Sequence, residues 1–291
     1  MIAITSSRPE LAQLAGDRPV MMRGAAAAWP AVRGWTPELF GARFAEHAVT
    51  PSVNLPDTEV PYRYRDRDYR QAMTMAELVR RMRAGERCYV DQMDVTELGG
   101  GLALDYDFAA FGPQAVKVIA LWLGAHTSSG LHYDWVDNLF AQIHGTKRVV
   151  LAAPDQAPYL YPFADNHTKS QVAPLHPDLR TFPRFRRAAL WSGLIEPGDV
   201  LYIPKGWWHF FSAPAASISL TCWYGAPLTP RQELAALVRL RSPRVWAGVA
   251  RDFVWHGVLS RPYHTRLFSL PPSGLMLYDL VRQAARSIAR R

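Results

Sequence analysis

Cysteine is almost absent from this chain. Only two cysteines occur among 291 residues, Cys88 and Cys222, and both lie within apolar, strand-like runs. We therefore expect two buried free thiols rather than a disulfide. Free thiols in a protein interior are typical of a reducing compartment.

The sequence also lacks a long apolar stretch. No run reaches the roughly eighteen apolar residues that a membrane-spanning helix needs. The first residues, Met1–Ile4, are not a basic segment followed by an apolar one, so no secretory leader is expected. Together with the cysteines, these features predict a cytoplasmic protein without a membrane span.

Net positive charge is missing from most of the chain, although the net charge of the whole is +8. From Arg231 to the end, eleven arginines stand against Glu233, Asp252 and Asp279, so this stretch carries the whole excess. A basic segment can attract nucleic acid or an acidic peptide. It can equally be the solvated face of an arginine-rich helix, and the sequence leaves both readings open.

Short apolar runs separated by turn residues dominate the middle of the chain. They cover residues 116–123, 139–143, 148–152 and 200–204. Strands of this length without intervening helices predict an all-β barrel or a two-sheet jelly roll. One long proline-rich excursion, residues 155–189, interrupts them, and long loops in compact domains tend to be functional.

Helical patterns flank this β region. Thr36 and Thr74 are predicted to cap short helices, Thr74 through a capping box with Glu77. A capping box at Thr229 opens a C-terminal helix, whose apolar face is expected to be Leu234, Leu237 and Val238. Near the end, an apolar stripe and a basic stripe run together: Leu277, Leu280, Val281, Ala284 and Ile288, beside Arg282, Arg286 and Arg290. The chain is therefore divided into a β domain, residues 1–228, and a basic helical region, residues 229–291.

Three side chains have the chemistry of a metal site. His132 and Asp134 are two residues apart in an extended segment, so both leave the same face of a strand. His209 would supply a third ligand from a distant strand. Two imidazoles and one carboxylate are the ligand set of mononuclear non-haem iron(II), with three positions open for a co-substrate and O2. Alternatively, His132 is a half-buried residue at a strand end and His209 packs against neighbouring tryptophans.

Lys147 is the fourth candidate. It precedes Val149-Val150-Leu151, which has the composition of a buried strand. A lysine that points inward at this position needs an anion, and a dicarboxylate co-substrate is a suitable one. The alternative is an edge lysine that faces water.

These residues and their neighbours also form a recognisable set of motifs. The set comprises His132-Tyr133-Asp134, Asn138–Ile143, Gly145, Lys147-Arg148, Ser170-Gln171-Val172, Pro197–Pro204, Trp207-Trp208-His209 and Trp223-Tyr224. It resembles the Jumonji-C branch of the 2-oxoglutarate oxygenases, and within that branch the asparaginyl hydroxylase of the hypoxia-inducible factor. The resemblance is strong from about Tyr89 to Pro227.

The resemblance implies a fold and a cofactor set. The fold would be mainly β: a double-stranded β-helix (jelly-roll, cupin-like) core, with flanking N-terminal α/β elements and a helical C-terminal region. His132, Asp134 and His209 would bind Fe(II), and Lys147 would pair with the distal carboxylate of 2-oxoglutarate. Further co-substrate contacts would come from Tyr89, Ser129, Asn138 and Thr221.

The implied activity is a dioxygenase reaction. With O2 and 2-oxoglutarate, the enzyme would hydroxylate an amino-acid side chain of a protein or peptide. Lys169 stands where the asparaginyl hydroxylase has a substrate-contacting glutamine, so that enzyme's substrate is not carried over. A tRNA or other nucleic-acid base hydroxylase and a non-catalytic cupin-like binding module are the alternatives. A homodimer through the C-terminal helices is also expected, unless their apolar stripe packs on the chain's own barrel.

Overall fold

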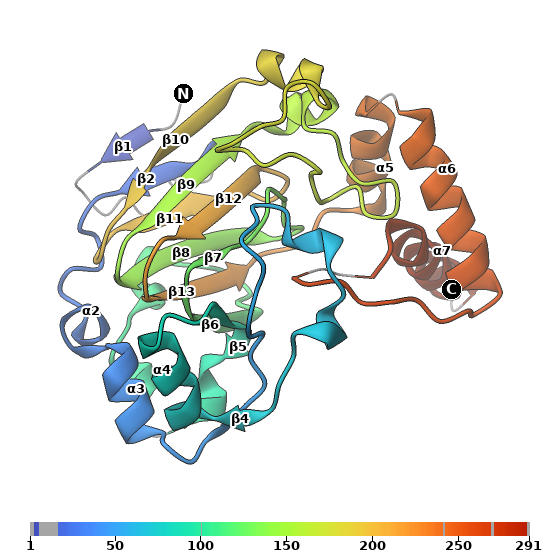
Figure 1. Cartoon of the computed structure of the whole chain (residues 1–291). Helices are drawn as coiled ribbons and strands as arrows, with labels where there is room; N and C mark the ends of the chain where they lie inside the picture. The colour runs from blue at the N-terminus through green and yellow to red at the C-terminus, as the bar shows by residue number, and fades with distance from the viewer. Residues whose placement is uncertain (1–2, 6–16, 100, 241, 269–270, 290–291) are drawn as a thin grey trace.

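Two β-sheets packed face to face form the centre of the molecule (Figure 1). The computed structural model describes residues 3–5, 17–99, 101–240, 242–268 and 271–289. The larger sheet has the strand order β1-β2-β11-β8-β13-β6-β5 and the smaller one β10-β9-β12-β7. This is the predicted jelly-roll core of a mainly β protein.

The strand bounds follow the apolar runs closely. Those of the larger sheet are β1 (Ala3–Thr5), β2 (Val20–Met22), β5 (Cys88–Asp94), β6 (Val118–Ala125), β8 (Asp137–His144), β11 (Val200–Ile203) and β13 (Ser217–Tyr224). Those of the smaller sheet are β7 (Thr127–Ser128), β9 (Lys147–Ala152), β10 (Leu190–Ile195) and β12 (Trp208–Ala213). A separate pair, β3 (Ala48–Val49) and β4 (Met73–Thr74), lies beside them.

Both faces of the central strands are mostly buried, which explains why the sequence reads as continuous apolar runs, whereas β10 at the edge of the smaller sheet is largely exposed. On β8, Phe140 points between the two sheets and stacks on Phe211 of β12, with ring centroids 4.1 Å apart. Its neighbours Leu139 and Ala141 point to the outer face of the larger sheet. The same alternation on every strand gives the interior of the barrel a row of inward side chains that can carry chemistry.

A tight hairpin joins β8 to β9. Gly145 has a φ of +70°, and a Cβ there would collide with the carbonyl oxygen of Ala216. Only glycine meets both conditions without strain. The turn sets the register that brings Lys147 to the start of β9.

Three helices cover the outer face of the larger sheet: α2 (Pro30–Gly34), α3 (Pro37–Arg43) and α4 (Met75–Arg83). The threonines predicted as caps, Thr36 and Thr74, both accept a hydrogen bond from the third backbone N–H of their helix. The capping box at Thr74 is only half formed, because the Glu77 carboxylate binds Arg80 and Arg81 instead.

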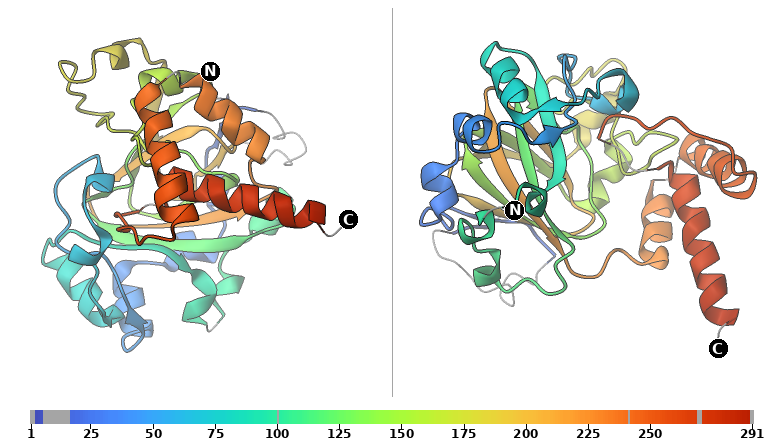
Figure 2. Two further views of the ribbon diagram at one scale, coloured as in Figure 1. Left: turned by 90° about the vertical axis from the view of Figure 1, so that its right-hand side faces the viewer. Right: turned by 90° about the horizontal axis from the view of Figure 1, so that it is seen from below.

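The outer face of the smaller sheet is covered by the long excursion and the C-terminal helices (Figure 2). The excursion is irregular apart from two 3-10 turns, Pro154–Tyr159 and Pro183–Arg187. The helices are α5 (Pro230–Arg239), α6 (Pro243–Asp252), a π-helical turn (Phe253–Val258) and α7 (Ser273–Ala289). These helices share one apolar cluster with the smaller sheet, and the division at residue 228 stays a prediction.

The predicted apolar face of α5 is wrong. Leu234 and Val238 are 46% and 58% exposed, whereas Glu233 and Leu237 are buried. The helix is rotated about its axis because Glu233 makes a buried contact with His167 of the excursion. A buried hydrogen-bonded pair of side chains has thus overridden the apolar pattern.

The stripe on α7 is partly buried. Leu277 packs against the apolar cluster of the smaller sheet, whereas Val281 is 52% exposed. Arg290 and the side chains of Ala284 and Ile288 lie outside the described residues. The dimer therefore stays a prediction.

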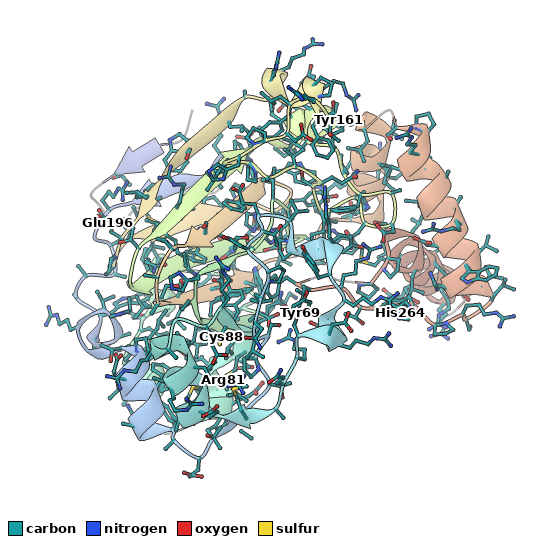
Figure 3. All side chains as sticks on the ribbon, in the orientation of Figure 1. Tyr69, Arg81, Cys88, Tyr161, Glu196 and His264 are labelled. Carbon is teal, nitrogen blue, oxygen red and sulfur yellow. The ribbon has the colours of Figure 1, made fainter. Side chains whose placement is uncertain are left out.

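Both cysteines are buried and free, as predicted. Burial raises the pKa of the Cys88 thiol to about 11 and that of Cys222 to about 12. Cys88 lies on β5 beside α4 (Figure 3). Among the described residues, no helix is both long enough and apolar enough to pass through a membrane.

Candidate metal centre and its cavity

The backbone aligns the two histidines directly. His132 donates its backbone N–H to the carbonyl of His209 at 3.0 Å and accepts the reciprocal bond at 2.6 Å. His209 lies near the start of β12 (Trp208–Ala213), on a distant strand as predicted. Residues paired in this way carry their side chains on the same face, so both imidazoles enter the barrel interior.

The three predicted ligands converge on one point. Nε2 of His132 lies 3.9 Å from Oδ1 of Asp134, and Nε2 of His209 lies 3.6 Å from Oδ2 of the same carboxylate. One ligand atom from each of the three residues lies within 4.8 Å of the others. This is the arrangement of a two-histidine, one-carboxylate metal site with an open face.

Hydrogen bonds behind the ligands fix their orientation. Nδ1 of His132 donates to the carbonyl oxygen of Gly130 at 2.9 Å, and Nδ1 of His209 donates to that of Trp207 at 3.0 Å. A carbonyl can only accept, so the proton of each neutral ring is on Nδ1 and the Nε2 lone pair faces the centre. Oδ2 of Asp134 accepts a third bond, from Nε1 of Trp223, at 3.0 Å.

The electrostatics of the site favour neutral imidazoles. Burial, with Lys169 and His209 nearby, places the pKa of His132 well below its usual value. Burial also lowers the pKa of His209, partly offset by the Asp134 carboxylate. Neutral imidazole is the form that binds a metal ion.

The ligands open into a cavity of about 240 Å³. The cavity is lined by all the residues that the sequence singled out for the metal and co-substrate: Tyr89, Ser129, His132, Asp134, Asn138, Lys147, His209 and Thr221. The structure brings these residues together from six strands and loops, while the role of each stays a prediction. The aromatic walls were not predicted: Trp122, Trp135, Trp223 and Phe268. Phe268 in particular comes from the C-terminal region, and no local pattern marks it.

Lys147 points into this cavity and is only 2% exposed, which excludes the water-facing alternative. Its Nζ lies 5.3 Å from the centre of the Phe140 ring and 6.0 Å from that of Tyr89. No carboxylate among the described residues pairs with it. Burial therefore lowers the pKa of Lys147 to about 7. A cation held in this way needs an anionic ligand.

Other polar groups in the cavity point to the same conclusion. Oδ1 of Asn138 and Nε1 of Trp135 are buried, and neither has a hydrogen-bond partner in the described part of the chain. Burial raises the pKa of Tyr89, so its hydroxyl remains a donor. Unpaired buried polar atoms are rare in native proteins and call for a ligand or water. The donors among these groups, Nε1 of Trp135 and the Tyr89 hydroxyl, fit a keto-diacid held between Lys147 and a metal ion.

Two of the predicted co-substrate residues already have protein partners. The Ser129 hydroxyl donates to the carbonyl of Gly130 at 3.0 Å and accepts from the Phe211 N–H at 3.0 Å. The Thr221 hydroxyl accepts from Nε1 of Trp122 at 2.9 Å, which leaves its own proton available. Of the two, Thr221 can contact a co-substrate without losing a bond, whereas Ser129 must turn its hydroxyl.

Known proteins match this chain over the same region. The cupin-like domain family matches residues 9–229. The chain belongs to this family. Lysine-specific demethylase 8 of Xenopus tropicalis is 31% identical over 223 residues, 72% of this chain and 49% of that protein. Jumonji C domain-containing protein 5 of Drosophila melanogaster is 40% identical over 117 residues, 38% of this chain and 28% of that protein.

A third relative of this cupin-like chain is tRNA wybutosine-synthesizing protein 5 of Danio rerio, 47% identical over 79 residues, 27% of this chain and 23% of that protein. The chain spans half or less of the length of these relatives. These relatives support the resemblance to the Jumonji-C family. Members of that family are generally Fe(II)- and 2-oxoglutarate-dependent oxygenases. The particular closeness to the asparaginyl hydroxylase stays a prediction.

A second buried polar cluster lies behind the cavity wall and was missed in the sequence. Nδ1 of His167 lies 2.7 Å from Oγ of Ser273, and its Nε2 lies 2.7 Å from Oε2 of Glu233. The order Ser–His–Glu resembles a hydrolytic triad, but Ser273 is only 2% exposed, so no substrate can reach it. We interpret the cluster as a tie between the excursion and helices α5 and α7.

Proposed function

We propose that this protein is an Fe(II)- and 2-oxoglutarate-dependent oxygenase that hydroxylates an amino-acid side chain of a protein or peptide. One observation carries the proposal. A two-histidine, one-carboxylate cluster shares a small buried cavity with Lys147, a cation that lacks a counter-ion among the described residues. Neither feature serves the stability of the barrel, because buried charges without partners are costly.

The residues have separate tasks in this reaction. His132, Asp134 and His209 would hold the iron, which with O2 and 2-oxoglutarate supplies the oxidative decarboxylation that drives hydroxylation. Lys147 would bind the remote carboxylate of 2-oxoglutarate through charge-assisted hydrogen bonds. Asn138 would turn its side-chain amide so that the N–H groups, rather than Oδ1, face the oxygens of the co-substrate. The aromatic walls would exclude water from the reacting atoms.

Removal of one ligand tests the proposal. The protein is loaded with iron under nitrogen, and bound iron and succinate release are then measured on admission of O2. Asp134→Ala should lose retained iron and 2-oxoglutarate turnover, whereas Asp155→Ala, at an exposed position of the excursion, should match the wild type. Full iron retention and turnover in Asp134→Ala would refute the site.

The names of two relatives point to two other reactions. Lysine-specific demethylase 8 is named for demethylation of lysine, but Lys169 places a second cation in this cavity. A methylated lysine side chain is itself cationic, and a buried positive charge would repel it. Demethylation is therefore disfavoured for this chain.

The second candidate function is hydroxylation of a nucleic-acid base. It is favoured by an arginine-lined groove of about 760 Å³, which includes Arg184, Arg244, Arg251 and Arg266. The groove runs between the excursion, near Tyr161 in Figure 3, and α6. If RNA is the substrate, tRNA should bind with a salt slope that reflects several phosphate contacts. A lack of tRNA binding at low salt would dismiss it.

A non-catalytic cupin-like binding module is the last alternative. It predicts a protein that binds a dicarboxylate at Lys147 but retains no iron. The same metal-loading experiment decides between this module and the oxygenase.

A further inference from the structure

The cavity contains a second buried cation, Lys169. The oxygenase mechanism proposed above assigns no role to this residue. Lys169 is 8% exposed and lines the same cavity as His132, Asp134 and His209. Its ammonium group forms no ion pair with any described carboxylate. Burial lowers the pKa of Lys169 to about 8, although the Asp134 carboxylate acts in the opposite direction.

Backbone pairing aims Lys169 at the metal site. His132 pairs antiparallel with His209 on one side and with Lys169 on the other. Directly opposed residues carry their side chains on the same face, about 5 Å apart at Cβ. The three side chains therefore form one row across three segments. Lys169 lies at one end of this row, on the excursion.

No carboxylate of the described residues forms an ion pair with Lys169. Among those residues, Asp134 is the only carboxylate that lines the cavity. Its Oδ2 accepts the Trp223 indole N–H, and both its oxygens face the histidine Nε2 atoms at 3.6–3.9 Å. Asp134 is therefore committed to the metal site rather than to an ion pair with Lys169.

The co-substrate does not account for Lys169 either. Lys147 lies deeper in the barrel, between the rings of Phe140 and Tyr89, and is suited to one carboxylate. The formal positive charge of Fe(II) and the two ammonium groups exceeds the negative charge of Asp134 and a 2-oxoglutarate dianion by one unit. An excess positive charge in a cavity walled by Trp135, Trp223 and Phe268 calls for a further anion.

We infer that Lys169 binds a carboxylate of the substrate, so that the amino acid presented to the metal site is acidic. This inference rests on the proposed function and adds the class of substrate to it. The carboxylate comes from an aspartate or glutamate side chain or from a terminal carboxyl group. Lys169 is a specificity-determining residue in this scheme, while Lys147 serves the co-substrate.

The backbone around Lys169 is built for such a role. Its carbonyl accepts the Phe163 N–H at 2.9 Å, and the adjacent Ser170 N–H donates to the carbonyl of Leu131 at 2.8 Å. Two residues earlier, His167 is tied to Glu233 of α5. A long lysine side chain on a fixed backbone loses less freedom when it binds an anion.

Small acidic probes test the inference without knowledge of the natural substrate. N-acetyl-aspartate N-methylamide and its asparagine isostere are titrated into the protein saturated with 2-oxoglutarate, both metal-free and iron-loaded under nitrogen. Binding is followed by the fluorescence of the tryptophans that line the cavity. The wild type should bind the acid at least about 10-fold more tightly than the isostere, because only the acid pairs with the ammonium group. N-acetyl-alanine, with only a terminal carboxylate, shows which of the two sources is preferred.

Variants assign the preference to one residue. Lys169→Met should bind acid and isostere equally, Lys169→Arg should keep the preference, and Lys117→Met, at an exposed lysine, should behave as the wild type. The affinity of Lys169→Met for 2-oxoglutarate should stay within about 2-fold of the wild type, which also shows that the variant is folded. A wild type without acid preference overturns the inference. So does a preference that survives in Lys169→Met, or a large loss of 2-oxoglutarate binding in that variant.

The two proposals fail separately. Iron retention and succinate release without acid preference would refute only the assignment of Lys169. Acid preference in a protein that retains no iron would refute the oxygenase and leave an acid-binding module.

Discussion

Replacement of Lys147 by methionine should stabilise the ligand-free protein. In the wild type, burial without a partner lowers the pKa of Lys147 from 10.5 to about 7. Such a drop corresponds to roughly 5 kcal/mol of destabilisation of the charged form, an upper value. Methionine fills a similar volume without charge, so we expect Lys147→Met to raise the free energy of unfolding by about 2 to 5 kcal/mol at pH 6. For a chain of this size the melting temperature should rise by about 5 to 15 °C.

The size of the stabilisation by Lys147→Met depends on pH. Below pH 7, Lys147 is protonated in both the folded and the unfolded chain, and the folded protein bears the full cost of burying the charge. Between pH 7 and 10.5, folding releases the proton and the cost declines, so the advantage of Lys147→Met should shrink as pH rises. Thermal unfolding at pH 6 and pH 9 measures both effects.

Addition of 2-oxoglutarate should reverse the order of stability. Saturating 2-oxoglutarate should raise the melting temperature of the wild type, because the ligand binds only the folded state. It should raise that of Lys147→Met much less. If Lys147→Met is no more stable than the wild type at pH 6 and gains as much from 2-oxoglutarate, then Lys147 does not hold an uncompensated charge and does not bind the co-substrate.

Three further outcomes are expected. Trp223→Phe, which removes the indole donor of Asp134, should weaken iron binding about 10- to 100-fold in an anaerobic titration; unchanged affinity would show that the bond does not orient the ligand. His167→Ala leaves the Glu233 carboxylate buried without its partner and should cost about 3 kcal/mol. Hydrogen exchange should then rise in α5 and α7, and equal protection in the variant would argue against the tie. The affinity for 2-oxoglutarate should fall about tenfold per pH unit above pH 7, because binding then requires Lys147 to take up a proton; calorimetry that finds no proton uptake would contradict this.

Local patterns predicted the parts of the fold that local forces decide. His132 and Asp134 converge as their spacing predicted, although they lie outside the named strands and only His132 forms isolated β-bridges. The threonine caps at Thr36 and Thr229 depend on contacts within one helical turn. The apolar run around Lys147 made an inward direction one of two readings, and the burial of Lys147 decides for that reading. In each case the information lies within a few neighbouring residues.

Contacts between distant segments were not predictable in this way. The apolar pattern of α5 pointed to Leu234, but a partner 66 residues away, His167, decided the orientation of the helix through Glu233. The hydrogen bond from Trp223 to Asp134 joins residues 89 positions apart. Likewise, Phe268 enters the cavity from beyond the matched domain. Such partners depend on the register of whole segments, which no short pattern contains.

The buried tie at His167 links two parts of the chain with different constraints. One part is the barrel, with its metal ligands and Lys147; the other is the set of C-terminal helices, which lies beyond the matched domain. His167 is two residues from Lys169, and Tyr133, which lies between two of the candidate metal ligands in the sequence, donates its hydroxyl to Glu233 at 3.4 Å. A shift of α5 therefore reaches both Lys169 and the segment of the candidate metal ligands. A substitution or a bound partner at these helices can therefore act on Lys169 and on the candidate metal ligands from outside the matched domain.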